Sequence, residues 1–158
     1  MTTGTTSHDT FVVERTYDAP VDRVFGAWAD PGAKARWFAG SAGALGTTYE
    51  LDFRVGGHER NRGGPPGGPL YTYDAEYRDI VPGRRIVTTY VMHADGVPIS
   101  ASVATVEFHP VGGSTRMVLT EQGVFLDGHD NVAQREEGTR AFLESLATAL
   151  ATAPPGTR

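Results

Sequence analysis

The sequence predicts a single α+β domain in which an antiparallel sheet packs against a long C-terminal helix. Three observations predict it. Strand-like runs follow one another with turn residues between them, two short helical segments come directly after the first strand, and the last long segment carries one apolar stripe at helical spacing. Helices that are segregated from an antiparallel sheet in this way are typical of the α+β class.

Length and composition fit one folded domain. The 158 residues are 39% hydrophobic and 21% charged, as in ordinary globular proteins, and they suffice for one hydrophobic core. We expect residues 10–151 to form this domain, with a disordered leader over residues 1–9 and a disordered tail over residues 152–158. The N-terminus lacks the basic start and apolar run of a secretion signal, so we expect a cytoplasmic protein.

Several classes of function are disfavoured by composition. The net charge is -5 and the basic residues form no long cluster, which argues against a nucleic-acid partner. No apolar segment approaches the length of a membrane span, so membrane insertion is not expected. The absence of cysteine excludes disulfides, thiolate metal sites and cysteine nucleophiles. A lysine Schiff-base mechanism would have to rest on Lys34, the only lysine.

The N-terminal part predicts one strand and two short helices. Residues 10–17, TFVVERTY, are rich in β-branched and aromatic residues, which favours a strand. Asp18 or Ala19 then precedes Pro20 at a helix start. The helix that follows has one apolar face, formed by Val21, Val24, Phe25 and Trp28. Proline disfavours helical geometry in the residue before it, so Pro31 ends this helix and can start a second one over PGAKARWF.

The middle of the chain predicts an antiparallel meander. Residues 49–55 alternate apolar and polar side chains, and Gly56 and Gly57 signal a turn. A short return strand, HERNR, leads to the loop NRGGPPGGPL, which lacks the ending of a phosphate-binding loop and is interpreted as a mobile hairpin loop that can act as a lid. Four more strand-like runs follow, over residues 70–81, 84–93, 100–110 and 114–125.

The C-terminal segment VAQREEGTRAFLESLATAL predicts a long helix that starts after Asp130 or Asn131 as the N-cap. Its apolar stripe consists of Val132, Phe142, Leu143, Leu146 and Leu150. We expect this stripe to pack against the sheet.

Five ordered motifs carry a family resemblance: YDAPVDRVFGAWADPGAKARWF, DFRVGG, YRDIVPGRRIV, VEFHPVGGSTRMVLTEQG and EEGTRAFLESLATAL. Over about residues 10–150 the chain resembles the SRPBCC superfamily, with its START and birch-pollen-allergen-like helix-grip fold. Within it, the chain is similar to the branch named for the activator of the heat-shock-protein-ninety ATPase. The resemblance implies a curved antiparallel sheet of about six to seven strands around the C-terminal helix, with an apolar cavity between them.

Members of this superfamily bind lipids, sterols, plant hormones or polyketides, and some act as polyketide aromatases or cyclases. The fold alone does not decide among these functions. The branch usually carries a Gly-Trp pair on the long helix, where this chain has Gly138 and Thr139. The smaller side chain is expected to enlarge the cavity unless Phe142 fills the space.

The candidate ligand-binding residues are those expected to face this cavity: Trp37, Phe38, Phe53, Tyr71, Tyr73, Tyr90, Met92, Phe108, Glu121, Phe125 and Phe142. An inward tyrosine needs a partner for its hydroxyl, whereas one at the rim can place it in water. We expect Trp28 to be part of the core and Trp37 to form a wall or gate of the ligand site. On this interpretation, Trp37→Ala changes ligand binding more than stability.

Glu121 is the candidate with two interpretations. Strict alternation in TRMVLTEQG puts Met117, Leu119 and Glu121 on one face, where a carboxylate would have a raised pKa unless paired. It could then bind the polar end of a ligand or act as a general acid or base. A bulge at Gly123, or a position near the open end of the sheet, would instead let the carboxylate reach solvent, and this second interpretation is the one we favour.

The histidines point to no metal site. His58, His93, His109 and His129 lie in or beside predicted turns without metal-ligand spacing. We interpret them as solvated, although His58 and Arg60 could line a cavity mouth. No metal and no cofactor are predicted.

The predicted function is binding of a small apolar or aromatic molecule in the cavity, without an assigned catalytic residue. Two alternatives remain open. One is a cyclase-like or aromatase-like enzyme that uses Glu121 or an inward tyrosine for proton transfer. The other is a chaperone-accessory interaction module, suggested only by the name of the branch. A homodimer is left open.

Overall fold

The computed structural model describes residues 3–39 and 48–152. Its helical elements are α1 (Val21–Ala29), α2 (Pro31–Lys34), the π-helix η1 (Ala35–Ala39) and α3 (Val132–Thr152). Its strands are β1 (Thr6–Tyr17), β2 (Thr48–Leu51), β3 (His58–Gly63), β4 (Tyr71–Val81), β5 (Arg85–Ala94), β6 (Val97–Val111) and β7 (Ser114–Leu126).

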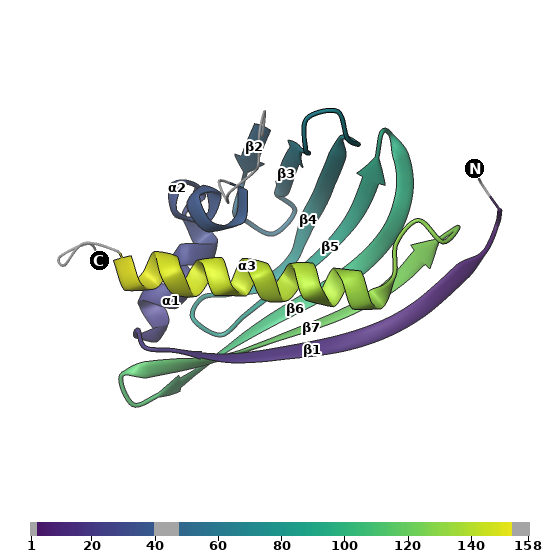
Figure 1. The fold of residues 1–158 in the computed structure, drawn as a ribbon. Helices are drawn as coiled ribbons and strands as arrows, with labels where there is room; N and C mark the ends of the chain where they lie inside the picture. Colours follow the sequence, from purple (N-terminus) through teal and green to yellow (C-terminus); the bar gives the residue numbers. More distant parts are fainter. Residues whose placement is uncertain (1–2, 40–47, 153–158) are drawn as a thin grey trace.

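The seven strands form one antiparallel sheet in the order β1-β7-β6-β5-β4-β3-β2. The sheet curves around α3, which lies across its concave face, while α1 and α2 lie near the C-terminal end of α3 (Figure 1). The predicted α+β class and helix-grip arrangement are therefore confirmed. No helix of the described residues is both long and apolar enough to cross a membrane.

The ends of the domain differ from the predicted bounds. Residues 6–9 belong to β1 and pair with β7, so regular structure begins inside the segment that we expected to be a disordered leader. Thr152 is the last residue of α3. The disorder predicted for residues 1–2 and 153–158 lies outside the described residues.

Asp30 and Pro31 set the junction between α1 and α2. The backbone of Asp30 is extended, and its Oδ2 accepts a hydrogen bond from the Ala33 amide at 2.8 Å, so Asp30 caps α2. Helix α1 starts at Val21 with Pro20 in the N-cap position, one or two residues after the predicted caps. The second predicted helix is α-helical only to Lys34 and continues as η1, a conformation that is frequent at functional sites.

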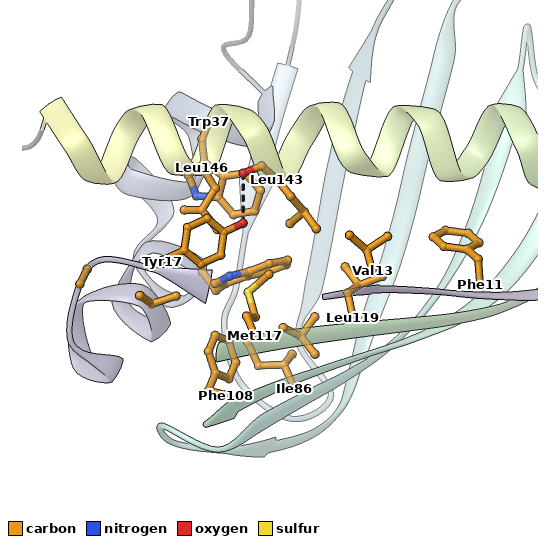
Figure 2. Close-up of a cluster of buried hydrophobic side chains, with 14 of the residues drawn as sticks. Phe11, Val13, Tyr17, Trp37, Ile86, Phe108, Met117, Leu119, Leu143 and Leu146 are labelled. Carbon is orange, nitrogen blue, oxygen red and sulfur yellow. Dashed lines mark hydrogen bonds between the residues drawn. The ribbon is translucent and has the colours of Figure 1, made fainter. Parts of the chain in front are cut away.

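The core lies between the concave face of the sheet and the α1 and α3 helices. Leu143 and Leu146, from the predicted stripe of α3, are fully buried (Figure 2). The Tyr17 hydroxyl donates a hydrogen bond to the Leu143 carbonyl at 3.0 Å, which ties β1 to α3 (Figure 2). Of the two predicted N-caps of α3, Asn131 takes the role, because its Oδ1 accepts from the Gln134 amide at 2.9 Å.

Candidate functional site

A cavity of about 490 Å³ lies between the concave face of the sheet and α3. Its size follows from small residues at facing positions. Ala104 faces it from β6, and Gly138 and Thr139 face it from α3. A Cβ atom placed on Gly138 would meet no atom within 4 Å. Phe142 contributes to the wall beside Thr139 without filling the space.

Eight of the eleven predicted binding residues line this cavity: Trp37, Phe38, Tyr71, Tyr73, Tyr90, Met92, Glu121 and Phe142. Their rings form a nearly continuous aromatic surface. Phe38 lies 4.8 Å from Phe142 and 5.2 Å from Tyr73, and Tyr73 lies 4.7 Å from Tyr90, measured between ring centroids. Whether these residues bind a ligand stays a prediction.

The other three predicted residues lie outside the wall. Phe53 packs edge-on against Tyr77, and Phe108 packs edge-on against Phe25. Phe125 lies beneath the guanidinium of Arg135, whose Cζ is 5.4 Å from the ring centroid. Each of these three rings thus packs against a neighbouring side chain and is absent from the cavity lining.

Of the turn and loop residues considered from the sequence, only some line the cavity. Gly63, Gly64 and Pro65, from the end of β3 and the loop after it, line the cavity, which leaves the lid interpretation as a proposal. His58 and Arg60 are exposed and outside the wall. Among the described residues, no group of three or more histidine, aspartate or glutamate side chains is arranged to hold a metal ion.

Trp28 is part of the core and Trp37 lines the cavity, as predicted, but the two roles are not separate, because Trp37 is also in the core and Trp28 also lines the cavity. Both rings line the cavity, and their centroids are 4.8 Å apart in an edge-to-face arrangement. The Trp37 indole N–H also donates to the Ala27 carbonyl at 2.9 Å. An α-helix would supply that donor from residue 31, but Pro31 has no N–H. Trp37 therefore supports the end of α1 as well as the cavity wall.

A buried ion pair between Lys34 and Glu59, at one end of the cavity, was not predicted from the sequence. The Lys34 ammonium lies 2.7 and 2.8 Å from the two carboxylate oxygens of Glu59, and both residues are buried. The hydroxyls of Tyr49 and Tyr77 donate to the same carboxylate at 2.6 and 2.7 Å. Burial and the charge of Glu59 raise the pKa of both tyrosines, so they remain hydrogen-bond donors.

Aromatic rings surround the cation of this pair. The Lys34 Nζ lies 4.7 Å from the ring centroid of Phe38 and 5.1 Å from that of Trp28, within the range of cation–π attraction. Lys34 lines the cavity, whereas Glu59 lies behind the wall. The helical spacing of Lys34, Trp37 and Phe38 is the sequence signal that would have placed Lys34 on the cavity face.

At the other end of the cavity, Glu121 points inward, so the interpretation that it reaches solvent is wrong. Only 4% of its surface is exposed, and its Oε2 accepts a hydrogen bond from the Tyr90 hydroxyl at 2.6 Å. The strand alternates regularly through this position, with Leu119 pairing with Val106 and Glu121 pairing with Ala104. Because no bulge precedes Glu121, its side chain faces the same way as that of Leu119.

Arg135 connects this end of the cavity to α3. Its Nη2 donates to Asp130 Oδ2 at 2.6 Å and to the Ser100 hydroxyl at 2.7 Å. Its Nη1 donates to the Tyr90 hydroxyl at 2.9 Å and lies 3.4 Å from Glu121 Oε2. Sequence reasoning missed Arg135, although it occupies a position of the helical stripe, three residues after Val132 and four before Thr139.

Burial raises the pKa of Glu121, and the hydrogen bonds from Tyr90 and Arg135 reduce this effect without cancelling it. In the folded chain Glu121 therefore binds a proton more strongly than in the unfolded chain. Stability from this group is fully present below the unfolded pKa of about 4.3 and is lost as pH rises through the folded value.

The free energy of unfolding of Glu121→Gln, relative to that of the wild type, is expected to increase as pH rises from about 4. The amide keeps the shape of the side chain but never ionises, so the variant escapes the pH-dependent loss. The measurement is urea unfolding of both proteins between pH 4 and pH 8. Glu137→Gln, at an exposed position of α3, is the control and should show no such trend. If the free energy of unfolding of Glu121→Gln minus that of the wild type stays constant or decreases as pH rises, the expectation is contradicted.

Comparisons with known proteins show which family the chain resembles. The model of the family described as "Activator of Hsp90 ATPase homolog 1-like protein" matches residues 18–151. The comparison with curated protein sequences gives no match.

Solved structures agree with the fold. A protein from Rhizobium leguminosarum is 45% identical with a TM-score of 0.91, covering 96% of this chain and 100% of that one. Protein Mll3558 from Rhizobium loti is 47% identical with a TM-score of 0.85, covering 92% and 99%. CalU16 from Micromonospora echinospora is 19% identical with a TM-score of 0.64, covering 94% and 87%, and at this identity shows the fold alone.

Proposed function

The chain belongs to the family of activator of Hsp90 ATPase homolog 1-like proteins, and from this premise we propose that it binds a small aromatic molecule between α3 and the sheet. The observation that carries the proposal is the cavity of about 490 Å³, which is within the usual range of small-molecule sites. Its walls are mainly apolar and aromatic, and its charged side chains belong to two clusters, one around Lys34 and one around Arg135.

The walls favour a flat aromatic body. Phe38, Tyr73 and Phe142 offer rings at which a ligand ring can stack or pack edge to face. Ile86, Val106 and Leu119 form an aliphatic surface from β5, β6 and β7. Burying about 300 Å² of apolar ligand surface contributes about 7 kcal/mol. Association costs reduce this gain, so we expect dissociation constants no tighter than the micromolar range.

Thr139→Trp is expected to weaken the binding of naphthalene at least about tenfold, which corresponds to about 1.4 kcal/mol. Thr139 is buried in the cavity wall on α3, so an indole ring at this position competes with the ligand for the same space. The measurement is a titration of naphthalene into the ¹⁵N-labelled protein, followed by amide chemical shifts.

Thr148→Trp is the matched control, because Thr148 lies on the same helix and is exposed. It should bind naphthalene as the wild type does. Well-dispersed amide spectra of both variants would show that they fold. If naphthalene shifts no resonances around the cavity of the wild type, or if Thr139→Trp binds it equally well, the proposed function is wrong.

A further inference from the structure

The charged groups at the cavity do not balance. The two clusters contain two cations, Lys34 and Arg135, and three carboxylates, those of Glu59, Asp130 and Glu121. Lys34 is matched by Glu59, with Nζ within 2.8 Å of both carboxylate oxygens. One carboxylate is therefore in excess, and it belongs to the cluster around Arg135.

Arg135 is already committed to other partners. Its 2.6 Å contact to Asp130 is much shorter than its 3.4 Å contact to Glu121, so Asp130 is its main counter-ion. Its remaining donors on Nη1 and Nη2 reach the hydroxyls of Tyr90 and Ser100. Both terminal nitrogens of the guanidinium therefore already donate to neighbours, which leaves them little capacity for an anionic ligand.

Glu121, unlike Arg135, has a polar atom that is free to bind a ligand. Both of its hydrogen bonds, from Tyr90 and Arg135, go to Oε2. Among residues 3–39 and 48–152, no hydrogen bond of normal geometry reaches its second oxygen, Oε1, although the side chain of Ser102 lies close enough to the carboxylate to lower its pKa. The residue is 96% buried and lines the cavity, so an acceptor faces the space where a ligand would lie.

We propose that the ligand is an aromatic molecule with a positively charged amine, which donates a hydrogen bond to Glu121 Oε1. This inference rests on the proposed function and names the chemical class of the ligand. An ammonium group supplies both features that Glu121 lacks, a donor and a compensating charge. The rings of Tyr73 and Tyr90 lie beside this position and favour a cation as well. A carboxylate on the ligand would instead add a second uncompensated charge.

Three probes with the same aromatic body test the proposal: naphthalene, 2-naphthylmethylamine, which is a cation at pH 7, and 2-naphthoate, which is an anion. For the wild type we expect the amine to bind at least about tenfold tighter than naphthalene, and 2-naphthoate to bind more weakly than naphthalene. In Glu121→Gln the preference for the amine should be lost while naphthalene still binds. Calorimetric titration at pH 7 gives the dissociation constants of the three probes. Glu137→Gln is the control and should bind all three as the wild type does.

The outcomes separate the two proposals. If naphthalene binds in the cavity but the amine binds no better than naphthalene, or 2-naphthoate binds best, the amine inference is wrong and the proposed function stands. If the preference for the amine persists in Glu121→Gln, Glu121 is not its acceptor and the inference is again wrong. If none of the three probes binds in the cavity, the proposed function itself fails.

Discussion

Lys34→Met is expected to lower the free energy of unfolding by about 3–5 kcal/mol. Methionine keeps most of the apolar stem among Trp28, Trp37 and Phe38 but removes the cation. The carboxylate of Glu59 is fully buried and would lose its counter-ion, keeping only the hydroxyls of Tyr49 and Tyr77. The measurement is urea unfolding at pH 7.

A second substitution separates loss of charge balance from loss of packing. In the double variant Lys34→Met with Glu59→Gln, the neutral amide no longer needs a counter-ion. Its oxygen can accept from one tyrosine hydroxyl, and its NH2 group can donate to the other. We expect it to recover most of the lost stability. Arg36→Met, at an exposed neighbouring position, should change stability by less than about 0.5 kcal/mol. If the double variant is as unstable as Lys34→Met, packing rather than charge explains the loss.

Trp37→Ala is expected to lower the free energy of unfolding by about 3–5 kcal/mol, in contrast to the prediction made from the sequence. The ring is 2% exposed and packs against Trp28 and Phe38. Its removal enlarges a cavity and also leaves the Ala27 carbonyl without its donor. Thermal or urea unfolding measures the effect.

Trp28→Phe is the matched comparison for this site. The Trp28 indole nitrogen is buried and has no hydrogen-bond partner among the residues that the structure describes, so phenylalanine removes no hydrogen bond there. Trp37→Phe removes one and should therefore be the more destabilising of the two phenylalanine variants. Equal stability of Trp37→Ala and the wild type would mean that Trp37 has no structural role.

Local sequence patterns are sufficient for most of the fold. Period-two alternation in residues 114–125 and the helical stripe of residues 132–150 each report which side of an element faces the core. Strand ends are less well marked, because the polar residues of 6–9 have no apolar pattern, and only their pairing with β7 makes them a strand. The change from α2 to η1 within PGAKARWF has no evident signal in the sequence.

The aromatic residues of the cavity wall could be predicted from local sequence patterns, but the charged residues at the cavity could not. Glu59 lies in the strand HERNR, which has no apolar residue to indicate the inward face. Its partner Lys34 is 25 residues away on a different element. Arg135 occupies the helical stripe, yet a stripe position held by arginine is ordinarily interpreted as its polar edge. Only the pairing of Tyr90 with Ser102 and of Glu121 with Ala104 brings this cluster together across β6.

The central claim is that an aromatic molecule enters the space between α3 and the sheet. Intermolecular nuclear Overhauser effects between bound naphthalene and protein methyl groups test it most directly. We predict contacts to the methyl groups of Ile86, Val106 and Leu119, which line the cavity. Contacts only to exposed valines such as Val12 and Val103, or no contacts at saturating naphthalene, would contradict the claim.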